Sequence, residues 1–97
     1  MAQIVYSQNA IANLACVFEF LLEHDPQAAI VSAAAICEAI ELLANHPMIG
    51  RRVEGELREL VISFGKTGYV ALYRFLPARE LVRILAIRRQ RELDFPT

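Results

Sequence analysis

Arginine is the residue type that gives this chain its clearest capacity for chemistry. A planar guanidinium group binds carboxylates and phosphates through paired hydrogen bonds and stays charged at physiological pH. The arginines that stand out all lie in the second half of the chain: Arg51, Arg52, Arg58, Arg74, Arg83, Arg88, Arg89 and Arg91. They predict either a basic surface for an anionic partner or solvated side chains that pair with Glu54, Glu56, Glu59 and Glu80.

The two interpretations apply to different arginines. For Arg79 and Arg83 we favour the solvated interpretation. Residues 88–91 read Arg-Arg-Gln-Arg, and like charges packed this closely repel one another unless an anion lies nearby, so there we favour a functional interpretation. Tyr69 and Tyr73 have rings able to stack on bases, but aromatic residues in a strand are more typical of packing.

The sequence offers little support for nucleophilic or metal chemistry. Its serines lie in no nucleophile motif, it contains no glycine-rich phosphate loop, and His24 and His46 lie at predicted helix ends, where a cap or surface role is expected. Cys16 and Cys37 lack the spacing of zinc ligands, and we expect both to be small buried core residues. We therefore expect neither a metal nor a cofactor.

Three strands must position the arginines. Residues 57–63, 68–76 and 80–88 are β-prone and are separated by turns at 64–68 and 77–79, so they predict a β-meander. Alternation in the middle strand puts Tyr69, Ala71, Tyr73 and Phe75 on one face and Val70, Leu72, Arg74 and Leu76 on the other. In the last strand it separates Val82, Ile84, Ala86 and Arg88 from Leu81, Arg83, Leu85, Ile87 and Arg89.

The first half of the chain predicts a strand and two helices. Residues 2–6 suit an edge strand that joins the later sheet. Ser7 is a helix cap before apolar residues at helical spacing over 8–23, and Asp25 followed by Pro26 predicts a second helix that begins at once. Residues 47–56, with Gly50 and Gly55, predict a connecting loop. The expected architecture is one α+β domain over residues 1–97, in the order β-α-α-β-β-β, with a helical hairpin packed on a twisted antiparallel sheet.

Composition points to a protein partner. The chain has 97 residues, of which 56% are hydrophobic, more apolar surface than so small a core is expected to cover. Residues 1–50 hold five acidic side chains and no Lys or Arg, whereas residues 51–97 hold all ten Lys and Arg. The net charge of −1 weakens any case for strong unspecific binding to nucleic acid. We find no secretory signal pattern and no apolar run of the ~18 residues that span a bilayer, so we expect a cytoplasmic protein without a membrane partner.

Five segments carry a resemblance to a known family: IVYS at 4–7, HPMIGRRV at 46–53, LRELVIS at 57–63, GYVALYRF at 68–75 and ILAIRRQRE at 84–92. In this order and spacing the chain resembles the ParE/RelE superfamily of bacterial toxins, most closely its ParE branch of plasmid-stabilisation toxins. The resemblance implies the α+β fold given above and a cognate antitoxin that neutralises the toxin by forming a complex with it.

The resemblance also implies two modes of action, since ParE-like toxins poison DNA gyrase and RelE-like toxins cut mRNA on the ribosome. Arg58, Arg74 and Arg91 would serve a nuclease of the second kind. However, Leu60 and Val70 stand where further basic residues are expected, and Phe95 is the nearest aromatic residue to a missing terminal tyrosine. Arg89 stands where ParE-like sequences often carry histidine.

These departures favour a toxin that binds a protein target, DNA gyrase, rather than an enzyme. The residues assigned to target or antitoxin binding are Arg58, Tyr73, Arg74, Arg88, Arg89, Arg91 and Phe95. The alternative is a ribosome-dependent endoribonuclease, for which direct binding to nucleic acid stays open. A third interpretation is a protein of this fold that has lost toxicity and binds only its antitoxin.

Overall fold

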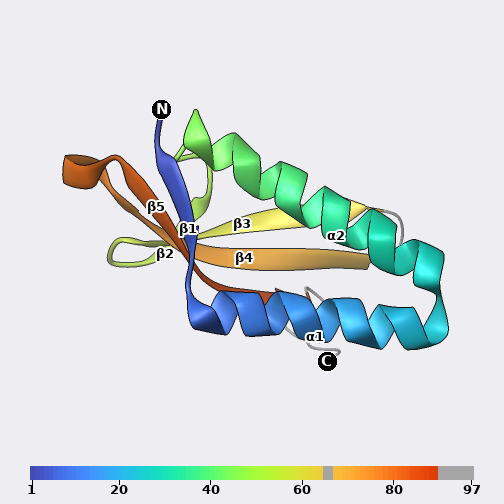
Figure 1. The fold of residues 1–97 in the computed structure, drawn as a ribbon. Coiled ribbons are helices and arrows are strands. Elements are labelled where there is room, and N and C mark those ends of the chain that lie inside the picture. The colour runs from blue at the N-terminus through green and yellow to red at the C-terminus, as the bar shows by residue number, and fades with distance from the viewer. Residues whose placement is uncertain (65–66, 90–97) are drawn as a thin grey trace, which may run out of the picture.

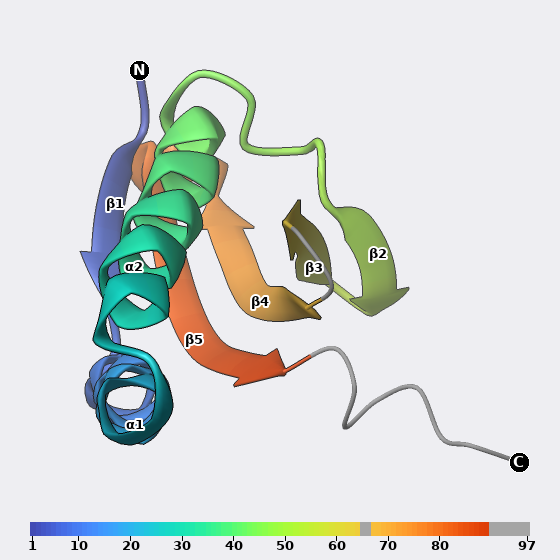
Figure 2. The ribbon, with the colours of Figure 1, turned by 90° about the vertical axis from the view of Figure 1, so that its right-hand side faces the viewer.

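Two helices cover one face of a five-stranded sheet (Figures 1 and 2). The computed structural model describes residues 1–64 and 67–89. Its elements in chain order are β1 (Gln3–Tyr6), α1 (Gln8–His24), α2 (Pro26–Glu41), the 3-10 turn η1 (Leu42–Ala44), β2 (Arg51–Glu54), β3 (Leu57–Phe64), β4 (Thr67–Leu76), the 3-10 turn η2 (Pro77–Arg79) and β5 (Leu81–Arg89). Figure 2 shows both helices on the same side of the sheet.

The helix boundaries follow from capping residues. The Ser7 hydroxyl accepts a hydrogen bond from the Ala10 N–H at 3.0 Å, and the Asp25 carboxylate accepts one from the Ala28 N–H at 3.2 Å. Asp25 also closes α1, because its own N–H donates to the Leu21 carbonyl at 2.6 Å. Pro26 then occupies the first turn of α2, where its missing N–H costs nothing. Both predicted helices and both predicted caps are confirmed.

The sheet has the strand order β1-β5-β4-β3-β2. The predicted meander and the predicted edge strand are confirmed, but the expectation of an antiparallel sheet is wrong in one pairing, because β1 runs parallel to β5 and the sheet is mixed. Residues 51–54, assigned to a loop, form β2 and pair with β3. All four residues of β2 are exposed, so this strand has no buried face and leaves no apolar alternation in the sequence.

The core lies between the helices and the sheet. Helix α2 contributes Ile36 and Ile40 to this core, and the following turn η1 contributes Leu43. They pack with residues of β4 (Tyr69, Ala71, Tyr73) and of β5 (Val82, Ile84, Ile87). Helical spacing of apolar residues predicts that Ile11, Leu22 and Ile30 belong to the buried faces of the two helices, but all three are exposed. Ala29 and Ser32 are buried instead. Because α2 is apolar nearly all round, its sequence pattern does not select the buried side.

Two further expectations are corrected. Cys16 and Cys37 are both exposed rather than buried in the core. In addition, residues Pro26–Ala44 form a helical stretch of 19 residues with mean hydropathy 1.6, which meets the length and composition of a membrane span. Ile36, Ile40 and Leu43 in that stretch are fully buried against the sheet, as in the core helix of a folded domain.

A β-bulge in β5 changes which residues face the core. In the pairing with β4, Leu72 lies opposite Ala86 and Tyr73 lies opposite Ile84, so Leu85 is an extra residue on β5. Val82 and Ile84 before the bulge face the helices, as does Ile87 after it. The predicted strict alternation of β5 is therefore wrong beyond Leu85, and Arg88 lies on the opposite face from Ile84.

Candidate functional site

Three arginines gather on the sheet face away from the helices. Arg74 and Arg83 lie directly opposite each other on β4 and β5, and Arg88 lies opposite Val70, three residues beyond the bulge residue Leu85. All three side chains are exposed. Within residues 1–64 and 67–89, no hydrogen bond or ion pair engages any of the three guanidinium groups. We call this surface the outer arginine face.

Apolar side chains separate these arginines. Val61 on β3 lies opposite Val70 on β4, on the same side of the sheet as Arg74, and its side chain is 50% exposed. Leu72 lies between Val70 and Arg74 on that face and is partly buried. Towards the β2 edge, Arg51 and Glu59 form an ion pair and so neutralise each other. The outer arginine face therefore combines positive charge with exposed apolar surface.

Arg58 and Tyr73 serve a different purpose from Arg74. Arg58 lies opposite Tyr73, so both face the helix side of the sheet. One guanidinium nitrogen of Arg58 donates to the carbonyls of Gly50 at 2.8 Å and Met48 at 3.2 Å. The Tyr73 hydroxyl donates to the Pro47 carbonyl at 2.8 Å and accepts from the Gly50 N–H at 2.8 Å. These bonds, which we call the loop clamp, fasten residues 47–50 to the sheet.

The environment of the clamp keeps Tyr73 neutral. Burial raises the pKa of the Tyr73 phenol, and the Gly50 N–H and the Arg58 charge offset only part of that rise. The side chain is 0% exposed, so Tyr73 offers no surface to a target or antitoxin. Beside the clamp, a cavity of about 260 Å³ is lined by Met48, Arg52, Glu56, Arg58, Phe75 and Pro77. Met48 is 61% exposed and forms an apolar rim there.

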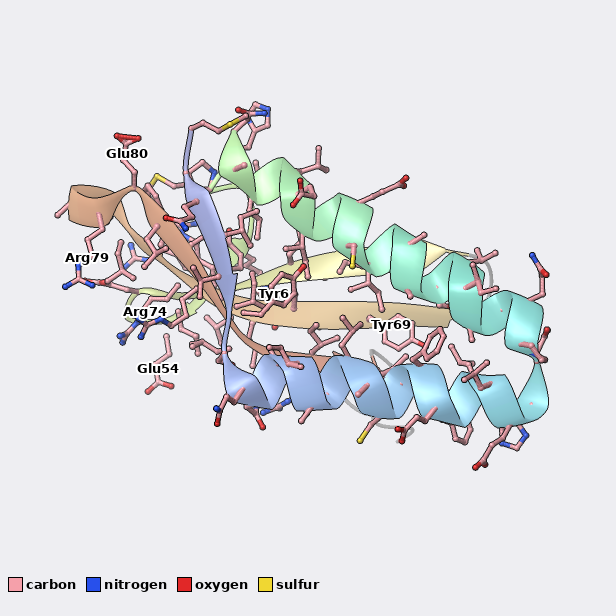
Figure 3. All side chains as sticks on the ribbon, in the orientation of Figure 1. Tyr6, Glu54, Tyr69, Arg74, Arg79 and Glu80 are labelled. Carbon is pink, nitrogen blue, oxygen red and sulfur yellow. The ribbon has the colours of Figure 1, made fainter. Side chains whose placement is uncertain are left out.

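Arg89 belongs to the helix side of the sheet. Its guanidinium carbon lies 5.3 Å from the centre of the Phe20 ring on α1, within the range of a cation–π contact. It lies opposite Tyr69, whose phenol pKa is raised by burial and lowered in part by the Arg89 charge. In the view of Figure 3, Tyr69 lies between the two helices, whereas Arg74 and Arg79 lie at the far end of the sheet.

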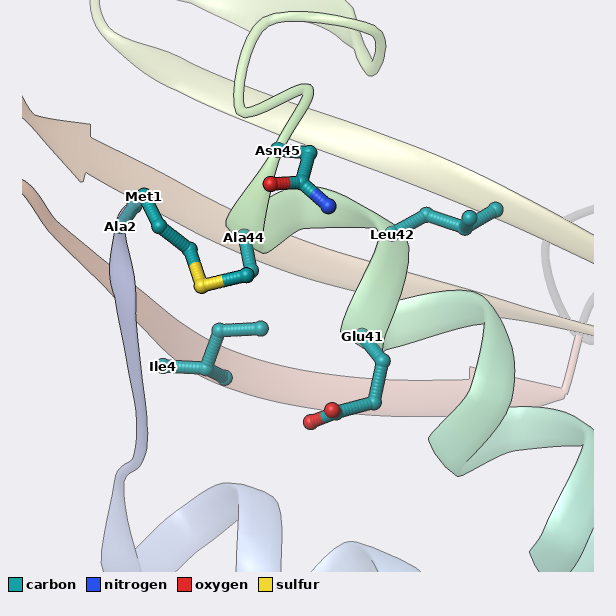
Figure 4. A pocket seen from close by; sticks show the side chains of 7 residues that line it. All are labelled: Met1, Ala2, Ile4, Glu41, Leu42, Ala44 and Asn45. Carbon is teal, nitrogen blue, oxygen red and sulfur yellow. The ribbon is translucent and has the colours of Figure 1, made fainter.

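A second cavity lies between the N-terminus and the end of the second helical segment (Figure 4). It measures about 460 Å³ and is lined by Met1, Ala2, Ile4, Glu41, Leu42, Ala44 and Asn45. Nearby, burial raises the pKa of Tyr6 to about 12, with further upward contributions from Cys37 and Glu41. The acidic and apolar lining of this cavity sets it apart from the arginine surfaces.

The structure thus divides the residues assigned to target binding. Arg74 and Arg88 share the outer arginine face with Arg83, which is exposed, in agreement with its predicted solvation. Arg58, Tyr73 and Arg89 lie on the helix side and make contacts within the fold. Arg91 and Phe95 lie outside the described residues. Sequence reasoning missed Asn9 and Asn13, two amides about one helical turn apart near the start of α1, and that spacing was the available signal.

Fold and surfaces together define a class of protein: a small α+β domain with an arginine-bearing sheet face, an apolar surface and a loop fastened by buried polar contacts. The chain belongs to the ParE toxin family of type II toxin–antitoxin systems, parDE, whose family model matches residues 4–94. Among curated proteins it is similar to two toxins of Caulobacter vibrioides. It is 36% identical to toxin RelE3 over 95% of this chain and 98% of that protein, and 35% identical to toxin RelE2 over 91% and 94%.

Solved structures confirm the expected RelE/ParE-like fold. The chromosomal ParDE system from P. aeruginosa matches with a TM-score of 0.75 and 22% identity, over 92% of this chain and 96% of that one. The intact E. coli RelBE toxin–antitoxin complex matches with a TM-score of 0.62 and 10% identity, over 91% and 95%. At these identities the likeness concerns the fold.

Proposed function

We propose that this toxin acts by binding and inhibiting a protein target, DNA gyrase, and that an antitoxin encoded beside it neutralises it by forming a complex in the cytoplasm. In this proposal residues 1–97 form one toxin domain, and the module serves plasmid stabilisation. Membership of the ParE family favours the gyrase target, and the partners named in the solved complexes support a cognate antitoxin.

One observation carries the choice of a protein target over RNA cleavage: Arg58 and Arg74, the two candidate nuclease arginines among the described residues, do not converge. Arg58 faces the helix side and donates to two loop carbonyls, whereas Arg74 follows Tyr73 on β4 and faces the other side of the sheet. Ribonuclease chemistry needs cations that meet around one phosphate. The two positions where basic residues were expected also support this choice, since Leu60 packs against the core and Val70 is 2% exposed.

Purified protein tests the proposal. We expect the toxin to inhibit DNA supercoiling by gyrase and to leave mRNA on programmed ribosomes uncut. Addition of the protein encoded by the neighbouring reading frame should restore supercoiling. Intact supercoiling together with cut mRNA would overturn the proposal.

The alternative function is a ribosome-dependent endoribonuclease, and the RelE names of the Caulobacter vibrioides relatives favour it. In that case, cleavage should fall steeply in Arg74→Ala. The third alternative, a fold that has lost toxicity, predicts normal growth when the toxin is expressed without its antitoxin. Growth arrest would exclude it.

A further inference from the structure

The β5 bulge is held by polar side chains from the first turns of α1. The Leu85 carbonyl accepts hydrogen bonds from the Asn9 amide at 3.0 Å and from the Ser7 hydroxyl at 3.2 Å. The Asn13 side-chain oxygen accepts a hydrogen bond from the Ile87 N–H at 3.0 Å. The Asn9 amide also reaches the Asn13 oxygen at 3.4 Å, which links the contacts into one network.

These contacts lie where a neighbouring strand ends. Strand β1 pairs with β5 only from Leu81 to Ile84, and the Ser7 N–H makes a last bond to the Ile84 carbonyl at 2.9 Å. Beyond that point the β5 backbone groups on this side need other partners, because unpaired groups are costly when shielded from water. Asn9 and Asn13 supply these partners. Their hydrogen bonds therefore stabilise the bulge, in which β5 carries one residue more than β4.

The bulge decides which arginines share a face. Arg83 and Arg88 are five positions apart, so a regular strand would place them on opposite faces of the sheet. The extra residue Leu85 reverses the alternation and brings Arg88 to the same face as Arg83 and Arg74. It also directs the neighbouring Arg89 towards Phe20 on α1.

The outer arginine face has the character of a site for carboxylates. Arg74 and Arg83 lie directly opposite each other, an arrangement that like charges disfavour. An anion placed between them relieves the repulsion, and a carboxylate matches the guanidinium geometry. The exposed Val61 and the nearby Leu72 suit a polypeptide with apolar side chains better than they suit a nucleic-acid backbone.

We propose that Asn13 is a positioning residue for partner recognition: by holding the β5 bulge it places Arg88 on the same face as Arg74 and Arg83, where the three arginines bind an acidic, partly apolar segment of a partner protein. The inference rests on the proposed function for the existence of that partner. It assigns to a residue on α1, remote from the arginines in sequence, an indirect role in recognition on the opposite face of the sheet.

Two NMR measurements test the positioning role. In Asn13→Ala, the Ile87 amide should exchange with solvent about tenfold faster or more, because its acceptor is gone. The Arg89 side-chain resonances should lose the ring-current shift from Phe20. Asn13→Asp keeps an acceptor oxygen and should restore both signals, while Gln8→Ala, an exposed change on the same helix, should alter neither. Unchanged signals in Asn13→Ala would overturn the proposal.

A double-mutant cycle tests the recognition role, with the protein encoded by the neighbouring reading frame as the probe. Arg88→Ala should weaken binding by about tenfold, a typical loss for an interfacial arginine. Asn13→Ala should weaken it comparably, and the double variant should bind no more weakly than Arg88→Ala within about twofold, because both changes remove one interaction. Circular dichroism at the binding temperature should show all three variants folded.

The opposite outcomes are distinct. Losses that multiply in the double variant, or an Arg88→Ala variant that binds normally, overturn the recognition role. Preferential binding of a single-stranded RNA oligonucleotide to the same face, lost in Arg88→Ala, also overturns it. Inhibition of gyrase supercoiling is measured separately. If the toxin does not inhibit gyrase but the double-mutant cycle gives the expected result, the proposed target is wrong and the proposed recognition surface stands.

Discussion

At the residue scale, Gly50 lies under the Tyr73 ring with no room for a side chain. A methyl group at Gly50 would come within 2.5 Å of the Tyr73 hydroxyl and 2.8 Å of the Glu59 carbonyl. The Gly50 N–H donates a hydrogen bond to the Tyr73 hydroxyl, and the Gly50 carbonyl accepts one from the Arg58 guanidinium. Gly50 is therefore required by close approach of the backbone to the aromatic ring.

We predict that Gly50→Ala lowers the free energy of unfolding by about 1–3 kcal/mol, the usual cost of overpacking. Urea denaturation followed by circular dichroism measures the loss. Gly55→Asn is the matched control: Gly55 has φ of 57° and nothing within 4 Å of an added methyl, and asparagine tolerates that conformation. A Gly50→Ala variant as stable as Gly55→Asn would contradict the packing described.

Tyr73 leads to a second prediction. Tyr73→Phe leaves the Pro47 carbonyl and the Gly50 N–H without their buried partner, so it should destabilise the fold by about 1–3 kcal/mol. The amides of Ile49 and Gly50 should also exchange faster with solvent, because the loop loses one of its two fastenings. Full stability with unchanged exchange would show that the Arg58 contacts alone hold the loop.

At the element scale, Ser7, the N-cap of α1, makes one more side-chain hydrogen bond within the described residues than Asp25, the N-cap of α2. Ser7 accepts from the Ala10 N–H and also donates to the Leu85 carbonyl in the bulge, while Asp25 makes only its cap contact among the described side-chain bonds. We predict a loss of about 1 kcal/mol for Asp25→Ala, the usual value of an N-cap. Ser7→Ala should cost about 1 kcal/mol more, for the additional hydrogen bond.

Unfolding in urea compares the two variants directly. Ser7→Ala should also speed exchange of the β5 amides near the bulge, which Asp25→Ala should leave unchanged. Equal losses for the two variants, with unaltered β5 exchange, would mean that the Ser7 contact to Leu85 adds nothing.

The elements differ in how far the sequence predicts them, and the reason is local. Ser7, Asp25 and Pro26 act on the turn that follows them, so the helix ends follow from sequence alone. The β2 strand has no buried face, so its sequence shows no apolar alternation. The parallel pairing of β1 with β5 joins segments far apart in the chain, so no local pattern predicts it. In residues 81–89 every position is apolar or arginine, so either phase of alternation fits and the bulge leaves no signal in the sequence.

The residues of the candidate site were likewise predictable only where their position depends on local sequence. Arg74 and Arg88 were assigned to a binding surface from their type and spacing, and both are exposed on one face. Arg83 was predicted to be solvated and is exposed, but the sequence did not predict that it shares a face with Arg88, because that depends on the bulge. Arg58 and Tyr73 were assigned to the surface because nothing in the sequence indicates that residues 47–50 fold back over them.

At the scale of the whole molecule, the three tyrosines should make the free energy of unfolding decrease at alkaline pH. Burial raises the pKa of Tyr6 to about 12 and raises the pKa of Tyr69 and Tyr73. All three pack in or against the core. An unfolded chain releases tyrosine protons near pH 10. Above that pH, the unfolded state therefore binds fewer protons than the folded state, and the free energy of unfolding falls as pH rises.

We predict that the stabilising contribution of Tyr6 is complete below pH about 10 and is lost as pH rises through its folded pKa of about 12. Urea midpoints measured at increasing pH should fall from pH about 10 upward, and phenolate absorbance should appear together with unfolding rather than before it. Tyr6→Phe should flatten the decline, while other groups that titrate in this range contribute equally to both proteins. A decline equally steep in Tyr6→Phe would show that Tyr6 ionises freely in the folded state and that the first strand does not bury its phenol.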